Sequence, residues 1–248
     1  MDHLTRAMDL ANAINQTILG CYGRFGFSGC TEPTPQAKEA AFCALKHARS
    51  QHVEDLLLLP TLLLAAEFQP GVFVELGALD GNRYSNTIVL ERCFNWTGIL
   101  IEANPSNFAK LARSTRKAVK VHSGVCSGIG SVRMTAAGFE EAADVDALPE
   151  PMLQGMLYRK KLANTTIDVP CRSLTSIMQD TGFPAADFLS LDVQGAEYKV
   201  LAAAQPQHFK VILVETYGVG INDVRFGENG KTRLQLIHER MAGGGLQL

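Results

Sequence analysis

The sequence predicts an α/β fold built on a doubly wound, mostly parallel sheet, with a helical extension in front of it. Three observations lead to this prediction. The chain has 248 residues, of which 46% are hydrophobic, and this suffices for one α/β domain with a sizeable core. Short apolar runs typical of buried strands alternate with helical segments. Acidic residues follow four of the five predicted strands, at the edge where such sheets bind ligands. We place the extension at residues 1–68 and the domain at residues 69–248.

The predicted extension consists of helices joined by an irregular connection. Residues 1–20, 36–50 and 53–67 suit helices, whereas residues 20–35 are rich in glycine and proline. Such a segment can form a lid in front of a ligand crevice. It can equally be a packing extension or an oligomer contact, and the sequence leaves the oligomeric state open.

Charge and hydropathy exclude two classes of function. The net charge of −2 argues against a broad nucleic-acid surface. The strongest apolar run, residues 56–66, is broken by Pro60 and is shorter than the roughly 18 residues that a membrane span needs. We therefore expect neither a nucleic-acid partner nor a transmembrane segment, and we interpret the apolar run as a buried helix pair.

The cysteines form no C-x-x-C pair and no metal-ligand spacing with the histidines. Six are present: Cys21, Cys30, Cys43, Cys93, Cys126 and Cys171. We expect reduced thiols and hence a cytoplasmic location. Three tripeptides match the glycosylation sequon, namely Asn15-Gln16-Thr17, Asn95-Trp96-Thr97 and Asn164-Thr165-Thr166. Because short motifs recur by chance and no secretory signal is visible, the sequons do not change this expectation.

The first strand–turn–helix unit carries the main binding signal. Residues 72–74 form an apolar strand, after which Glu75, Gly77 and Gly81 precede a helix predicted at residues 85–94. Glycines let a backbone approach a ligand, and the free N–H groups of the helix start face the same space. The spacing lacks the close glycine pair of a G-x-G-x-x-G loop. It resembles the first motif of class I methyltransferases that use S-adenosylmethionine (SAM); an ordinary strand-to-helix turn is the alternative.

The second and third predicted strands add a nucleoside signal. Residues 98–101 form a short apolar run that ends at Glu102. An acid at this place, some 20–30 residues after the glycine loop, accepts hydrogen bonds from ribose hydroxyls in NAD and SAM sites alike. Residues 119–123 read as the third strand, and Val125 and Cys126 follow it in the loop where an adenine ring would lie.

Between the third and fourth strands of the sheet we expect an insertion. A strand at residues 131–135 precedes it, and an extended stretch at residues 166–169 and a helix at residues 173–180 follow it. The insertion itself, residues 136–165, has acids early and bases late. It is either a mobile segment that faces the substrate or a solvated loop.

The fourth and fifth strands bring further carboxylates to the same edge. Residues 188–191 end at Asp192, and residues 211–214 end at Glu215. In a doubly wound sheet the fourth strand lies beside the first, so Asp192 should face the glycine loop. There it could take a proton from a hydroxyl, orient it or hold a divalent ion. Glu197 could share this work or stabilise the start of its own helix. Since buried acids are costly unless paired, their clustering indicates a site.

Three blocks in this order resemble the FkbM-type family of class I SAM-dependent methyltransferases: VELGALDGNRYSNT, WTGILIEANP and FLSLDVQGAEYKVL. The resemblance covers roughly residues 70–217 and implies a Rossmann-like fold that methylates hydroxyls of small polar, sugar or natural-product substrates. Carried over by position, it implies SAM contacts for Glu75, Gly77, Gly81 and Glu102, a methionine-end position for Ser85 and Asn86, and a reaction centre at Asp192 and Glu197. Gln194 stands where the family usually has glutamate. This difference removes one acid from the element; a divalent metal is still compatible with the site, but no ligand set indicates one.

Two alternatives to an O-methyltransferase are kept. The first is a catalytically inactive binding module with the same fold, because fold does not guarantee function. The second is a nicotinamide oxidoreductase, which the absent G-x-G-x-x-G disfavours. A helix is predicted at residues 231–242, and the chain ends where a sixth strand would begin, so the last strands are expected to be truncated.

Overall fold

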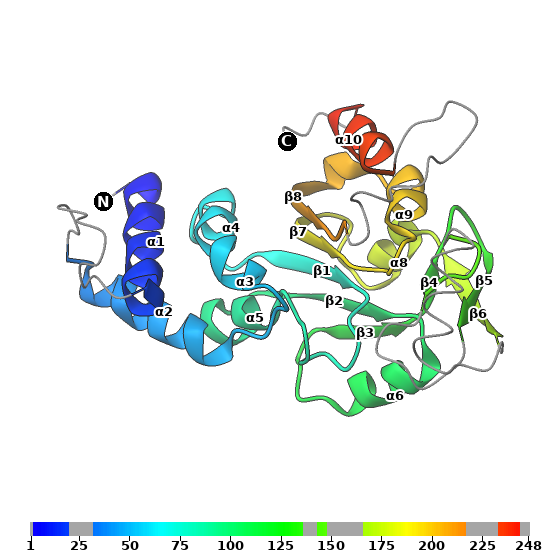
Figure 1. The fold of residues 1–248 in the computed structure, drawn as a ribbon, viewed down its shortest axis with the longest axis horizontal. Coiled ribbons are helices and arrows are strands. Elements are labelled where there is room, and N and C mark those ends of the chain that lie inside the picture. The colour runs from blue at the N-terminus through cyan, green and yellow to red at the C-terminus, as the bar shows by residue number, and fades with distance from the viewer. Residues whose placement is uncertain (1, 20–31, 136–142, 148–165, 217–232, 244–248) are drawn as a thin grey trace.

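A computed structural model describes residues 2–19, 32–135, 143–147, 166–216 and 233–243 (Figure 1). At its centre is a five-stranded parallel sheet with the strand order β3-β2-β1-β7-β8. Its strands are β1 (Val72–Leu76), β2 (Thr97–Glu102), β3 (Val119–His122), β7 (Ala186–Leu191) and β8 (Phe209–Val214). The chain winds outward from β1 through β2 to β3 and then continues on the other side of β1 with β7 and β8. This arrangement confirms the predicted doubly wound fold and puts its switch point between β1 and β7.

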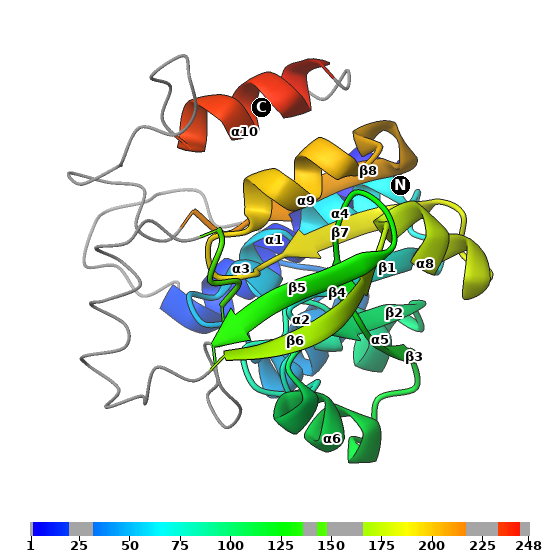
Figure 2. The same cartoon turned by 90° about the vertical axis from the view of Figure 1, so that its right-hand side faces the viewer.

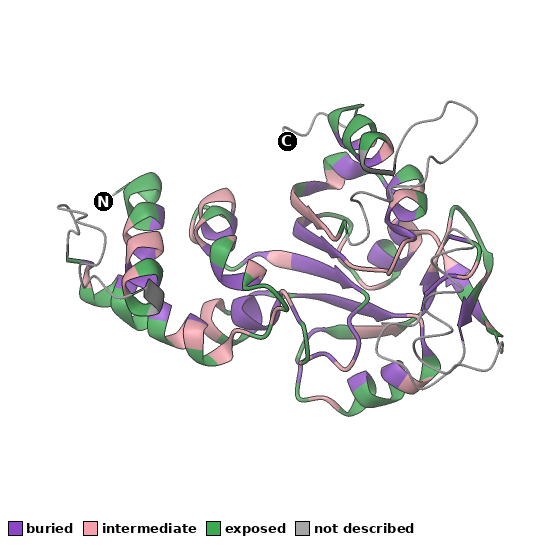
Figure 3. Cartoon of the chain, in the orientation of Figure 1, coloured by how far each residue is buried: buried purple, intermediate pink, exposed green. Residues whose placement is uncertain are grey.

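Helices cover both faces of the sheet. They are α5 (Ile88–Phe94), α6 (Pro105–Arg113), α8 (Leu174–Asp180), α9 (Glu197–Ala203) and α10 (Arg233–Gly243), with a 3₁₀ turn at Pro206–His208. Successive strand residues point to opposite faces. Phe73 therefore packs in one core cluster with α5, and Val74 packs in another with α8, α9 and α10. Figure 2 shows α9 and α10 on the same side of the sheet, and Figure 3 shows that the strands of its centre are mostly buried.

The helix predicted at residues 85–94 begins only at Ile88. The three residues before it, Ser85, Asn86 and Thr87, instead bond to a carboxylate of β1, and their turn delays the helix. The helix predicted at the C-terminal end is present as α10. The predicted truncated strand after it falls on residues 244–248, outside the described residues.

A second, small sheet has the order β4-β6-β5. It consists of β4 (Gly124–Val125), β5 (Gly130–Thr135) and β6 (Thr166–Arg172), and β5 and β6 are antiparallel. The strand predicted at residues 131–135 and the extended stretch predicted at residues 166–169 thus pair with each other in this sheet. Of the predicted insertion at residues 136–165, the structure describes residues 143–147, and Asp144 there pairs with Lys199 of α9 at 3.1 Å.

The predicted extension contains α1 (His3–Leu19), α2 (Pro35–His47), α3 (Glu54–Leu57) and α4 (Leu59–Ala65). The helical run predicted at residues 53–67 forms two helices, as the break at Pro60 predicted. Pro60 occupies the first turn of α4, where its missing N–H costs nothing. Ile14 of α1 and Ala41 of α2 belong to the same core cluster as Phe73 of the sheet. The extension therefore shares one core with the sheet, and the boundary at residue 68 stays a prediction.

The predicted reduced thiols are wrong for the four cysteines that the structure describes. Cys43 of α2 is bonded to Cys93 of α5, and Cys126 is bonded to Cys171 of β6, with Cα–Cα distances of 5.9 and 5.7 Å. The partners lie 50 and 45 residues apart in sequence, so no spacing motif announces them. Cys21 and Cys30 lie outside the described residues.

Across the part of the chain that the structure describes, no helix has the length and apolar character needed to cross a membrane.

Candidate functional site

The carboxyl ends of β1, β2, β7 and β8 meet at one edge of the sheet. Two backbone hydrogen bonds extend the ladder past the strand ends: Asp192 N–H donates to Leu76 O (3.1 Å), and Glu215 N–H donates to Leu191 O (2.9 Å). Glu102 is the last residue of β2 at the same edge. The structure thus brings together three of the four carboxylates that the sequence predicted at this edge, and it buries the fourth beneath them.

That fourth carboxylate, Glu75, lies under the glycine loop. Its oxygens accept hydrogen bonds from Ser85 Oγ (2.9 Å), Asn86 N–H (2.9 Å) and Thr87 Oγ1 (2.6 Å). Burial raises the pKa of Glu75, against the opposing effect of the nearby Arg116 guanidinium. The carboxylate of Glu75 therefore holds the end of the glycine loop against β1. The Ser85 hydroxyl, which was predicted at the methionine end of SAM, is one of the groups that bind this carboxylate.

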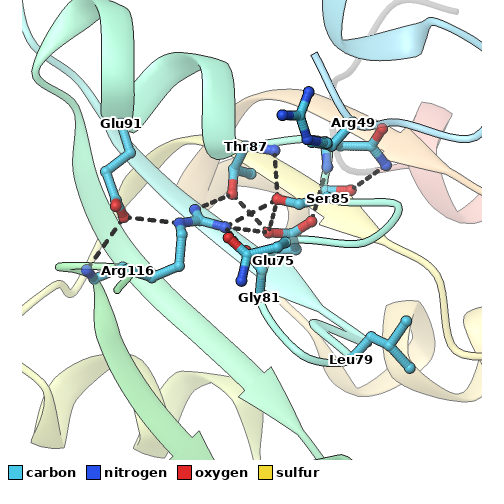
Figure 4. Close-up of polar contacts among 12 residues, drawn as sticks. Arg49, Glu75, Leu79, Gly81, Ser85, Thr87, Glu91 and Arg116 are labelled. Atoms are coloured by element: carbon cyan, nitrogen blue, oxygen red, sulfur yellow. Dashed lines mark hydrogen bonds and ion pairs between the residues drawn. The ribbon is translucent and has the colours of Figure 1, made fainter. Parts of the chain in front are cut away.

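Arg116 is the cation of this buried network (Figure 4). Its side chain is completely buried, and its Nη1 donates to Gly81 O (2.6 Å) and Ser85 Oγ (3.0 Å). Its Nε donates to Glu91 Oε2 (3.1 Å), and its Nη1 lies 3.7 Å from Glu75 Oε2. Arg116 and Glu91 were not predicted from the sequence, because neither is part of a motif. The available signal was indirect: an acid buried in a strand needs a cation nearby.

The two loop glycines are required by contacts within the chain. Gly77 has a φ of +86°, and a Cβ built there would overlap the backbone carbonyl oxygen of Asp192. Gly81 has a φ of +80°, and its Cβ would come within 2.7 Å of Leu111 Cδ1. Both positions are unfavourable for any other residue. Contacts within the chain thus account for both glycines, and the predicted close approach of this loop to a ligand stays a prediction.

Glu102 joins the end of β2 to the glycine loop. It is buried, and its two oxygens accept from Leu79 N–H (2.8 Å) and Asn104 N–H (2.7 Å). Burial raises the pKa of Glu102 to about 7, because desolvation outweighs these hydrogen bonds. Each carboxylate oxygen can accept a further bond, so the predicted contact with ribose hydroxyls is chemically available.

At the other side of the switch point, Gln194 joins two carboxylates. Its Nε2 donates to Asp192 Oδ1 (2.8 Å) and to Glu215 Oε2 (3.1 Å). Its backbone is left-handed, with a φ of 53°, and this turns the side chain back across the strand ends. Burial, and then the adjacent Asp192 carboxylate, raises the pKa of Glu215 to about 9.

Glu197, which was predicted beside Asp192 in the reaction centre, is buried at the start of α9. Its Oε1 accepts from Gly195 N–H (2.9 Å) and Val193 N–H (3.3 Å). These contacts match the second role that the sequence left open, stabilisation of its own helix start.

A cavity opens between the turn that precedes α5 and the ends of β7 and β8. Its lining includes Tyr84, Asn86, Ser190, Asp192, Glu215 and Thr216 from the domain, and Gln51, His52 and Glu54 from the extension. The side-chain amide of Asn86 donates to Ser190 Oγ (3.1 Å), whereas its Oδ1 is buried and has no hydrogen-bond partner among the described residues. A polar ligand with a donor could satisfy this oxygen.

Val125 and Cys126, the residues predicted on the adenine side, are not part of the cavity lining. Val125 belongs to β4 of the small sheet, and Cys126 is tied to Cys171, so it offers no free thiol to a ligand. Among the described residues, no group of three or more His, Cys, Asp or Glu side chains is arranged to hold a metal ion.

Comparison with known proteins gives one match. The model of a protein family described as "Methyltransferase FkbM domain" matches residues 75–239, which is more than half of the 248-residue chain. Searches of the curated proteins and of the solved structures found no match.

Proposed function

The chain belongs to the FkbM methyltransferase family, and we propose that it transfers a methyl group from SAM to a hydroxyl of a small polar, sugar or natural-product acceptor. The observation that carries this proposal is the meeting of Glu102, Asn86 and Asp192 around the switch point of a doubly wound sheet. It places a nucleoside-type acceptor, Glu102 at the end of β2, at the same sheet edge as a cavity whose lining includes an open polar atom of Asn86 and a candidate base, Asp192.

The residues at the sheet edge fit SAM. Glu102 can accept hydrogen bonds from the two ribose hydroxyls, and the unpaired Asn86 Oδ1 can accept one from the ammonium group of the methionine part. Gly77 and Gly81 keep the loop in its bent path, and the network of Glu75 and Arg116 holds that loop in place. We assign cofactor binding to these side chains, with Val125 and Cys126 retained as the proposed adenine side.

SAM supplies an activated methyl group when bound, so the chain mainly has to bind and orient the acceptor and to receive its proton. Asp192 lines the cavity and is the proposed proton acceptor for the hydroxyl. Gln194 fixes its carboxylate by the 2.8 Å hydrogen bond and joins it to Glu215, whose pKa burial and then Asp192 raise. His52 and Glu54 line the cavity from the extension, so this segment covers one side of the crevice.

Binding is tested by calorimetric titration with SAM and with its demethylated product, S-adenosylhomocysteine. We expect micromolar affinity, about −8 kcal/mol, and its loss in Glu102→Ala. Glu39→Gln, which changes an exposed side chain of α2, should bind like the wild type. A folded wild-type protein that binds neither compound would contradict the proposal.

Turnover separates an enzyme from an inactive binding module of the same fold. Release of S-adenosylhomocysteine is followed with a panel of sugars and other polyhydroxylated acceptors. Asp192→Asn should retain SAM binding and lose about 10²–10⁴-fold in kcat with any accepted substrate. SAM binding without turnover across the panel would favour the binding module, and undiminished turnover in Asp192→Asn would remove Asp192 from the chemistry.

A further inference from the structure

We propose that Asn95 is a site of N-linked glycosylation and that this chain matures in an oxidising compartment. The proposal is independent of the methyltransferase chemistry. It joins two features that the proposed function does not use: the disulfides and the sequon Asn95-Trp96-Thr97.

The disulfides indicate the compartment. All four cysteines that the structure describes are paired, and none of them is free. Both pairs cross-link separate elements. One joins α2 to α5, and the other joins Cys126, the residue after β4, to β6. Such bonds persist in secretory and extracellular compartments and are rare in the cytosol, where thiols are kept reduced. Sequons are modified in secreted proteins, so the same compartment gives the tripeptide a use.

The sequon lies in a surface turn. Helix α5 ends at Phe94, and Asn95 follows in the left-handed conformation with a φ of 56°. Asn95 and Thr97 are exposed, whereas Trp96 between them is 3% exposed and belongs to the core. Within the described residues, no hydrogen bond engages the side chains of Asn95 and Thr97. The buried Trp96 thus anchors the turn and leaves both recognised side chains in solvent.

The sequon at Asn15 lacks this arrangement. Asn15 lies inside α1, where successive residues turn by about 100°, so Asn15 and Thr17 point to different sides of the helix. The Thr17 hydroxyl is also engaged, since it donates to Ala13 O (2.8 Å). Asn164 lies outside the described residues.

A glycan on Asn95 would leave the crevice open. Asn95 precedes β2, and Glu102 ends it, so the length of a six-residue strand, roughly 17 Å, separates the turn from the ligand edge. The turn is also two residues from Cys93, whose disulfide holds α5 to α2. The polar glycan would therefore cover a rigid corner at the amino edge of the sheet.

The modification is a group transfer from a lipid-linked oligosaccharyl diphosphate. The Asn95 side-chain nitrogen forms a bond to the anomeric carbon of the sugar and loses one proton to a base. The bond between that carbon and the diphosphate oxygen breaks, and the lipid diphosphate leaves with the electron pair. No oxidant or reductant takes part.

The test uses the full chain purified from the cells that naturally produce it. A peptide N-glycosidase, which hydrolyses the amide bond between the asparagine side chain and the glycan, should increase its gel mobility and convert Asn95 to aspartate, as read by peptide mass spectrometry. Thr97→Ala should abolish the shift, whereas the matched Thr97→Ser keeps a sequon and should retain it. Asn15→Gln should also retain it.

Three results would overturn the proposal. The first is an Asn95 peptide that is recovered unmodified from the native protein, and the second is a shift that survives Thr97→Ala. The third is alkylation of Cys43, Cys93, Cys126 and Cys171 in the denatured protein without prior reduction, which would remove the oxidising compartment. None of these results touches SAM binding, so the failure of this proposal is distinct from failure of the proposed function.

Discussion

Arg116 shows how one side chain can set the geometry of a binding loop. It is the cation for two buried carboxylates, Glu75 and Glu91, and it also donates to the Gly81 carbonyl. Removal of one partner from a buried ionic network costs more than a surface pair does, because charges remain without compensation in a medium of low dielectric constant.

Arg116→Met should therefore lower the free energy of unfolding by about 3–5 kcal/mol, as measured by urea denaturation. The matched Arg113→Met, on the exposed side of α6, should change it by no more than about 0.5 kcal/mol. Equal effects of the two substitutions would show that the network does not stabilise the fold.

Glu102 makes ligand binding depend on pH. Its pKa is raised to about 7, chiefly by burial, so it is mostly neutral at pH 6 and mostly ionised at pH 8. Because its folded pKa lies above the unfolded value, its contribution to stability is full below about pH 4.5 and is lost as the pH rises through 7. Hydroxyl donors from a ligand would offset this loss, since they stabilise the carboxylate.

We expect S-adenosylhomocysteine to bind up to about tenfold more tightly at pH 8 than at pH 6, because the ionised fraction rises by that factor. Glu102→Gln should bind more weakly and show no such change. The measurement is calorimetric titration of both proteins at the two pH values. A wild type that is as insensitive to pH as the variant would exclude Glu102 from the ribose contact.

At the scale of elements, the distance between β1 and β7 is set by the absence of a side chain. Gly77 follows β1, and its Cα faces the carbonyl of Asp192 so closely that no Cβ fits. Gly182, after α8, has a similar φ of +81°, but a Cβ added there would meet no atom within 4 Å. Comparison of Gly77 with Gly182 therefore separates the free-energy cost of backbone strain from that of steric overlap.

Gly182→Ala should cost about 1 kcal/mol of unfolding free energy from strain alone. Gly77→Ala should cost at least about 3 kcal/mol and weaken SAM binding, because the ends of β1 and β7 must separate. Urea denaturation and calorimetry measure the two effects. Similar losses at both positions would mean that the crevice adjusts without cost.

In the molecule as a whole, the helical extension and the sheet act as one body. They share a core cluster, the Cys43–Cys93 disulfide joins α2 to α5, and residues 51–54 reach the cavity beside Asp192. The cross-link closes a segment of about 50 residues and restricts the unfolded chain accordingly.

The double substitution Cys43→Ser with Cys93→Ser should lower the free energy of unfolding by about 2–4 kcal/mol. It should also raise the KM of an accepted substrate more than it changes SAM affinity, since His52 and Glu54 lose part of their support. Denaturation and steady-state kinetics check the two statements. Unchanged stability would show that the shared core alone holds the extension.

The order of the elements, the parallel sheet and the carboxylates at its edge follow from the amino-acid sequence alone. These features are encoded locally: apolar periodicity marks each strand and helix, and the parallel topology then brings residues such as Glu102, Asp192 and Glu215 to the same edge. The methyltransferase motifs are local for the same reason, since each comprises one strand and the turn that follows it.

The partner that each of these groups takes is settled only in three dimensions. Arg116 meets Glu75 and Glu91, Gln194 joins Asp192 to Glu215, and Cys43 meets Cys93 across many intervening residues. Charge pairing and cross-linking depend on burial and on distance in space, and a sequence pattern of period two or 3.6 contains neither.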